Sequence, residues 1–127
     1  MGISVGSVLL GSADPDRLLE WYRAALAPWH DGDGFIHFAG IDILIDGRSD
    51  VAATSREPGR FVLNFHVDDA RATAAHLDTV GVTWLVPLEE RPDGLFATFS
   101  DPDGNTLQII QLTPEYREHL ENVPRSR

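Results

Sequence analysis

The chain contains no cysteine and no lysine, and it has no long apolar run. Without cysteine, disulfides, thiolate catalysis and cysteine-based metal sites are all excluded. No apolar segment approaches the roughly 20 residues that a membrane-spanning helix requires. The N-terminus also lacks a basic stretch followed by an apolar block, which is the pattern of a secretory signal. These absences predict a cytoplasmic protein with no membrane partner.

Acidic residues outnumber basic ones by 20 to 10, which gives a net charge of −10, and every basic residue is arginine. A nucleic-acid partner is not expected, because binding phosphate needs a basic face. The negative field would instead attract a cationic ligand. The same charge could serve only to keep the protein soluble. The length of 127 residues and the hydrophobic share of 43% fit one globular domain.

The hydrophobic pattern divides this single domain into two units with a similar order of elements. Module one, residues 3–46, has a strand, a helix and two short strands. A polar linker with glycine and proline covers residues 47–59. Module two, residues 60–112, has a strand, a helix and three more strands. Residues 113–127 predict a C-terminal helix or arm.

Both expected helices carry recognisable end signals. Asp14 is placed to cap the first helix, and Pro15 suits its first position. The pair Asp68-Asp69 opens the second helix, and Gly81 is placed to end it, because glycine adopts the left-handed conformation that follows many helices.

The most informative segment is residues 101–111, Asp-Pro-Asp-Gly-Asn-Thr-Leu-Gln-Ile-Ile-Gln. Its first five residues favour a tight turn, and the apolar residues that follow have no helical period, as in a buried strand. This segment, together with residues 14–22 and 66–81, resembles the vicinal oxygen chelate superfamily, which includes glyoxalase I, extradiol dioxygenases and bleomycin-type resistance proteins. The resemblance covers residues 5–112.

The resemblance implies an α+β fold. Two βαβββ modules would form an open, cup-shaped, eight-stranded mixed sheet around a cavity, with the helices on its outer face. It also implies a homodimer, because a second copy commonly covers the sheet edges in this superfamily.

Alternation along the expected strands assigns side chains either to the helix side or to the cavity side. Aromatic walls with a few polar groups suit a small organic ligand, and nearby carboxylates suit a cationic one. Phe96 and Phe99 point to opposite faces, so no more than one of them lines the cavity. The predicted ligand-binding residues are Ser7, Trp29, Phe35, Asp42, Leu44, Asp46, Val62, Asn64, Trp84, Phe99 and Gln108.

Metal-dependent relatives place two ligands in each module. The resemblance carries those positions to Ser7, Leu44 (or Asp46), Val62 and Gln108. Gln108 stands where a glutamate is usual, and two hydrocarbon side chains offer no donor at all. The resemblance therefore implies a protein with no metal and no cofactor.

Two histidines are candidate catalytic residues. His66 faces the cavity by alternation and has a side chain that can exchange protons near neutral pH. It equally fits a solvated histidine at the rim of the sheet. His37 is either cavity-facing or a satisfied histidine within the sheet. Asp42 and Asp46 share a face, where they could form a carboxylate pair of raised pKa, bind a cation or discourage pairing at a wet edge.

Three functions from different classes follow. The first is a metal-free protein that sequesters a hydrophobic small molecule, which the charge would allow to be cationic. Bleomycin-type resistance proteins work in this way, as dimers with the ligand between subunits. The second is a lyase, isomerase or dioxygenase-like enzyme, either metal-free with His66 or His37 in acid–base catalysis, or metal-dependent through a different ligand set. That set would be Asp46, His37, His66 and Gln108. The third is an accessory subunit with a vestigial cavity.

Overall fold

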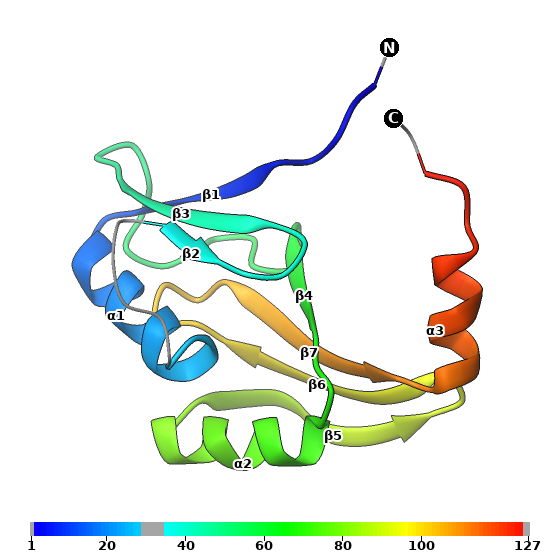
Figure 1. The fold of residues 1–127 in the computed structure, drawn as a ribbon. Helices are drawn as coiled ribbons and strands as arrows, with labels where there is room; N and C mark the ends of the chain where they lie inside the picture. The colour runs from blue at the N-terminus through cyan, green and yellow to red at the C-terminus, as the bar shows by residue number, and fades with distance from the viewer. Residues whose placement is uncertain (1, 29–34, 126–127) are drawn as a thin grey trace.

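The computed structural model describes residues 2–28 and 35–125. No helix among these residues is long and apolar enough to cross a membrane. Figure 1 shows α1 and α3 on opposite sides of the view, with the strands between them. In chain order the elements are β1 (Ser7–Ser12), α1 (Pro15–Leu26), β2 (Phe35–His37), β3 (Asp42–Gly47), β4 (Val62–His66), α2 (Ala70–Val80), β5 (Thr83–Arg91), β6 (Gly94–Ser100), β7 (Thr106–Leu112) and α3 (Pro114–Glu121).

The strands form two separate sheets. The N-terminal sheet has three strands in the order β1-β3-β2, and the C-terminal sheet has four in the order β4-β7-β6-β5. β1 with β3 and β4 with β7 are parallel pairs, whereas the other pairs are antiparallel. The α+β class and the two-module arrangement are therefore confirmed.

The number of strands and the number of sheets both differ from the prediction of one eight-stranded sheet. The described residues form seven strands in two sheets, because the first module supplies only three. Residues 48–61 run as turns and bends, and their side chains are nearly all exposed. Pro58 and Gly59 also disfavour a strand there. This linker folds back on its own chain, where the Ser55 amide donates to the Asp103 carbonyl at 2.7 Å.

The end signals of the helices are confirmed. Asp14 caps α1, and its side chain accepts a hydrogen bond from the Arg17 amide. Asp69 caps α2 in the same way through the Ala72 amide. Gly81 ends α2 with φ of +85°, a left-handed conformation that strains other residues. The C-terminal segment forms the helix α3, which has no fully buried residue.

One hydrophobic core serves both sheets. It joins Leu18 and Tyr22 of α1 to Ile43 of β3 and to Leu107 and Ile109 of β7. Each of these residues is at most 1% exposed. The helix-facing sides of both sheets pack on this shared core, so their opposite sides, here called the open faces, lie outside it.

Alternation places the side chains of β3 as predicted. Ile43 and Ile45 are buried in the core, whereas Asp42, Leu44 and Asp46 are partly exposed on the other face.

The same alternation holds in β4. Leu63 and Phe65 pack against the core, and Val62, Asn64 and His66 are exposed. Side chains from module one and module two therefore lie on two different open faces.

Candidate functional site

The open face of the N-terminal sheet carries an apolar row across its three strands. Leu44 of β3 lies opposite both Leu9 of β1 and Phe35 of β2. Leu9 is 50% exposed, although large apolar side chains are usually covered. This row forms a hydrophobic strip that a flat apolar ligand could cover.

Two carboxylates flank the apolar row. Along β3, Asp42 lies two residues before Leu44 and Asp46 lies two residues after it. Asp42 pairs with Ser7 of β1 and with His37 of β2. The Asp42 and Asp46 side chains are 40% and 47% exposed. They have separate partners, so they do not form the shared carboxylate pair that was one interpretation of the sequence.

His37 is held in a fixed orientation on this face. Its Nδ1 lies 2.8 Å from Oδ1 of Asp42. Its ring stacks on Phe35 with the ring centres 5.9 Å apart and an interplanar angle of 14°. A carboxylate that holds one ring nitrogen of a histidine fixes the direction of the other. Asp46 has a different partner, since the Arg48 guanidinium lies 3.8 Å from its carboxylate.

The open face of the C-terminal sheet is more polar. Asn64, Gln108 and Thr98 lie side by side on β4, β7 and β6. Gln108 donates to the Thr98 hydroxyl at 3.3 Å, which turns its amide along the sheet. Val62, at the start of β4, is 41% exposed.

The next row of this face lies under α3. His66, Ile110 and Phe96 are neighbours across β4, β7 and β6. Phe96 and Ile110 are only 8% and 6% exposed, and Leu120 of α3 packs against the small cluster that they form with Leu112. At the edge of this cluster is a pocket of about 310 Å³ lined by His66, Val67, Asp68, Ile110, Leu112 and Arg117.

The positions matched to metal ligands do not fit a metal ion. Ser7 and Leu44 lie on the open face of one sheet, and Val62 and Gln108 on that of the other. Leu44 and Val62 are hydrocarbons, and a catalytic metal usually has at least three protein ligands. Across residues 2–28 and 35–125, no group of three or more histidine, aspartate or glutamate side chains could hold a metal ion.

Two of the aromatic candidates lie on the helix side. Phe99 is 0% exposed and belongs to the core. Its partner across the sheet is Leu107, which faces the same way, so the prediction that Phe99 lines a cavity is wrong. Trp84 packs on Phe99 with centres 5.5 Å apart and donates from its indole nitrogen to Asp78 at 2.7 Å, so it is also a structural residue. Trp29 lies outside the described residues.

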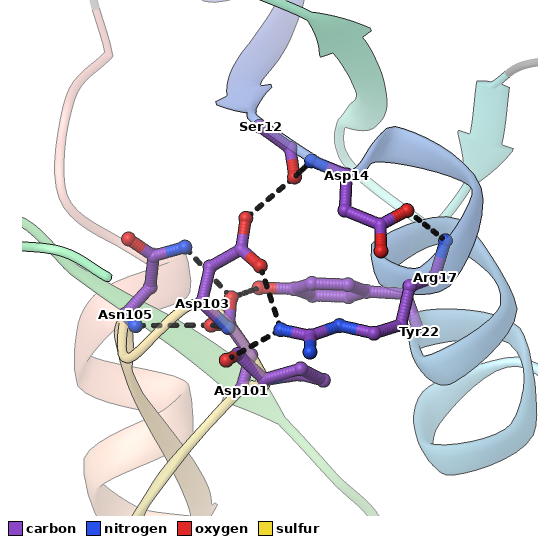
Figure 2. Close-up of polar contacts among 8 residues, drawn as sticks. Ser12, Asp14, Arg17, Tyr22, Asp101, Asp103 and Asn105 are labelled. Atoms are coloured by element: carbon purple, nitrogen blue, oxygen red, sulfur yellow. Dashed lines mark hydrogen bonds and ion pairs between the residues drawn. The ribbon is translucent and has the colours of Figure 1, made fainter. Parts of the chain in front are cut away.

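A buried polar cluster connects the two modules at the turn between β6 and β7 (Figure 2). The Asp101 carboxylate accepts hydrogen bonds from the Tyr22 hydroxyl at 2.7 Å, from the Asn105 side chain at 2.8 Å, and from the amides of Asp103 and Asn105, both at 2.9 Å. Gly104 adopts φ of +77° in this turn, as the motif predicts.

Asp103 extends this cluster to β1 and α1. Its carboxylate accepts from the Ser12 hydroxyl at 2.6 Å and lies 3.4 Å from the Arg17 guanidinium. Arg17 also donates to the Pro102 carbonyl at 3.0 Å. The turn of module two is thus bonded to the first strand and helix of module one.

Burial is the largest influence on the pKa values of Asp101 and Tyr22 in this cluster. It raises the pKa of the Asp101 carboxyl, and the hydrogen bonds from Asn105 and Tyr22 oppose that rise. Burial raises the pKa of the Tyr22 phenol well above its ordinary value, and the nearby Asp101 carboxylate adds to the effect. These polar groups are hydrogen-bonded to one another, so we assign them to the fold. Asp103 and Asn105 also line a pocket of about 400 Å³ beside the linker, whose other walls include Asp50, Thr54 and Arg56.

Residues 7–110 match the model of the glyoxalase-like domain family. The chain belongs to this family. The resemblance to the vicinal oxygen chelate superfamily found in the sequence is thereby confirmed, and the match spans both modules and the turn of residues 101–105.

Several solved structures share the glyoxalase-like fold of this chain. TnmS3, an antibiotic-binding protein from Streptomyces sp. CB03234, is 22% identical with a TM-score of 0.67, over 89% of this chain and 99% of that one. A glyoxalase/bleomycin resistance protein from Albidiferax ferrireducens T118 is 20% identical with a TM-score of 0.69, over 86% and 98%. A glyoxylase/bleomycin resistance protein/dioxygenase domain from Frankia sp. EAN1pec is 21% identical with a TM-score of 0.64, over 89% and 98%. At such identities the likeness concerns the fold, and no curated protein matches the chain.

Of the residues that line the pocket beside α3, the predicted site residues include only His66, and Arg117 comes from the most distant segment of the chain. Arg117 reaches the open face because α3 docks there, and its side chain lies beside Ile110 and Leu112 in the pocket. No period or motif in residues 113–127 indicates where this helix packs.

Proposed function

We propose that this glyoxalase-like protein is a metal-independent binding protein for a hydrophobic, cationic small molecule. The observation that carries the proposal is the apolar row Leu9–Leu44–Phe35, with Asp42 and Asp46 on its two sides. Hydrophobic surface holds the body of a ligand, and a few placed polar groups fix its orientation.

The chemistry of this face favours a planar cation. The stacked rings of Phe35 and His37 offer a flat surface to an aromatic ligand, and a ring face attracts positive charge. Asp42 and Asp46 are exposed enough to approach a cationic group of that ligand. The net charge of −10 attracts the same class of molecule over a longer range.

The proposal includes a homodimer, which is supported by exposed apolar residues on the two sheet edges. β1 and β4 are both edge strands. Val5 and Leu9 near the first edge are 75% and 50% exposed, and Phe61 and Val62 at the second are 85% and 41% exposed. Phe61 directly precedes β4, and its side chain is not covered by the core. Unpaired edges with apolar side chains favour association with another chain.

Such a dimer would complete the site. The two open faces of one chain lie on separate sheets around a shared core, so each needs an opposing surface to enclose a ligand. The N-terminal open face of one copy would meet the C-terminal open face of the other, and Asn64 and Gln108 would supply hydrogen bonds. The ligand would then lie between the two chains.

The comparisons support binding rather than identify the ligand. A structural neighbour, TnmS3, is an antibiotic-binding protein, and another is a glyoxalase/bleomycin resistance protein. The proposal keeps the cytoplasmic location and the absence of a nucleic-acid partner that the composition predicts.

A second candidate function is metal-free proton transfer. The contact of 2.8 Å between His37 and Asp42 favours it, because a carboxylate that orients a histidine is a common arrangement for a general base. A substrate with an acidic proton would have to lie within hydrogen-bond reach of the His37 ring. His37→Asn distinguishes the two functions, since it would abolish turnover but only weaken the binding of a stacked cation.

Calorimetric titration with proflavine, a planar aromatic cation, tests the first function. We expect proflavine to bind more tightly than anthracene-2-sulfonate, a flat anion of similar size. Asp42→Asn should weaken proflavine binding by about fivefold, the effect of one partly exposed charge pair. Glu57→Gln removes the same charge from the linker and is the matched control. Equal affinity for the cation and the anion would reject the proposed ligand class.

A further inference from the structure

The pocket under α3 has the features of a small ligand site that is separate from the apolar row. Its floor is formed by Ile110 and Leu112 of β7. Its walls come from His66 at the end of β4, Asp68 in the loop that follows, and Arg117 of α3. At about 310 Å³, its volume suits a molecule of a few carbon atoms with one polar group.

The polar groups of this pocket are not used by the fold. Among the described residues, the side chains of His66, Asp68 and Arg117 form no hydrogen bond or ion pair with one another or with any neighbour. Other arginines of this chain do pair, as Arg60 does with Glu57 at 2.8 Å. A guanidinium above an apolar floor is well suited to bind a planar carboxylate through two parallel hydrogen bonds.

We propose that this pocket binds a small amphipathic monocarboxylate. Arg117 holds the carboxylate, His66 donates a second hydrogen bond, and the hydrocarbon part lies on Ile110 and Leu112. Asp68 at the rim disfavours a second negative charge, which selects monocarboxylates over dicarboxylates. This site needs no second copy of the chain and does not depend on the proposed cationic ligand.

The docking of α3 explains why the pocket exists. Without that helix, Ile110 and Leu112 would be an exposed apolar patch on the open face, whereas Phe96 is also covered by the Arg91 guanidinium, 4.6 Å from its ring centre. Leu120 covers one part of the patch, and the part left beside Arg117 is the pocket. Because α3 has no fully buried residue, filling the pocket should hold the helix more firmly on the sheet.

The probe is hexanoate, compared with hexylammonium and hexan-1-ol, which carry the same hydrocarbon chain. Amide and methyl chemical shifts of the labelled full chain are followed by NMR during titration. We expect saturable shifts at Ile110, Leu112 and Arg117 with hexanoate, and weaker binding of the other two compounds. Equal binding of hexylammonium, or shifts confined to other parts of the chain, would overturn the proposal.

Two variants test the assigned roles. Arg117→Gln should weaken hexanoate binding by about fivefold, and Asp68→Asn should strengthen it, because it removes a repelling charge. Arg60→Gln is the control, since it removes the same charge from the segment just before β4. The proposal fails if Arg117→Gln and Arg60→Gln have the same effect. Hexanoate titration of Asp42→Asn separates this site from the other, because Asp42 lies on the N-terminal sheet and its substitution should leave hexanoate affinity unchanged.

Discussion

Replacing Tyr22 with phenylalanine tests the buried connection between the modules. The Tyr22 ring fills the core, and its hydroxyl is the only part that the substitution removes. That hydroxyl donates to the Asp101 carboxylate at 2.7 Å (Figure 2). Phenylalanine keeps the ring and its packing, so the experiment isolates one hydrogen bond between α1 and the turn of module two.

The expected loss of stability follows from the charge of the acceptor. A hydrogen bond to an ionised group contributes about 1.5–3 kcal/mol, roughly twice that of a neutral pair. Asp101 keeps its bonds from Asn105 and from the amide of Asp103, so it is not left unpaired. We therefore expect Tyr22→Phe to lower the free energy of unfolding by about 2 kcal/mol at pH 7, which corresponds to a fall in Tm of about 7 °C for a chain of this length.

The loss should also depend on pH. Burial raises the pKa of Asp101 in the folded protein, so the folded state holds this proton more tightly than the unfolded chain does. The stability associated with Asp101 is thus present below the ordinary carboxyl pKa of about 3.9 and is lost as pH rises through the folded value. The Tyr22 hydrogen bond opposes the shift, so Tyr22→Phe raises the pKa further. The difference in unfolding free energy between the native protein and Tyr22→Phe should be small in acid and largest near neutral pH.

Urea denaturation of both proteins at several values from pH 3.5 to pH 7 measures this difference. Tyr116→Phe is the matched control, because Tyr116 is 39% exposed on α3 and makes no hydrogen bond through its hydroxyl among the described residues. A loss below about 0.5 kcal/mol at pH 7, or a loss independent of pH, would refute the assignment of this bond.

Three further predictions concern the core, a helix end and the sheet edge. Because Phe99 is fully buried, Phe99→Ala should lower the free energy of unfolding by about 3–5 kcal/mol, measured by chemical denaturation. Gly81→Ala should cost about 1 kcal/mol, since alanine is strained at φ of +85°; an unchanged melting temperature would contradict this. Val62→Asp should turn the proposed homodimer into a monomer in analytical ultracentrifugation without unfolding it, whereas Thr79→Asp, at an exposed position of α2, should not. A dimer that persists in Val62→Asp would exclude β4 from the interface.

Much of the fold could be predicted because its signals are local. The caps at Asp14 and Asp69 and the glycine at position 81 act within one helical turn, so a single sequence contains them in full. Alternation in β3 and β4 likewise depends only on neighbouring residues. The missing eighth strand was implied by the family architecture, whereas the linker residues themselves indicated turns.

The site was harder to predict because it depends on how distant segments pack. Alternation correctly separated Phe96 from Phe99, but it did not show which of the two faces the core. That depends on pairing with β7, where Phe99 lies opposite the buried Leu107. Sequence could not show that both modules share one core, which places Leu44 and Gln108 on separate faces. Nor could it place Arg117, since the docking of α3 depends on an apolar patch formed by β6 and β7.

The central claim, that this glyoxalase-like protein binds a small molecule without a metal, is tested most directly by titration after complete metal removal. The protein is treated with chelator, its metal content is measured, and proflavine binding is compared before and after adding Mn²⁺, Ni²⁺ or Zn²⁺. We predict less than stoichiometric metal, an unchanged proflavine affinity and a melting temperature that none of the metals raises. A stoichiometric metal whose stabilising effect disappears in Gln108→Ala would contradict the account and indicate a metal-dependent enzyme.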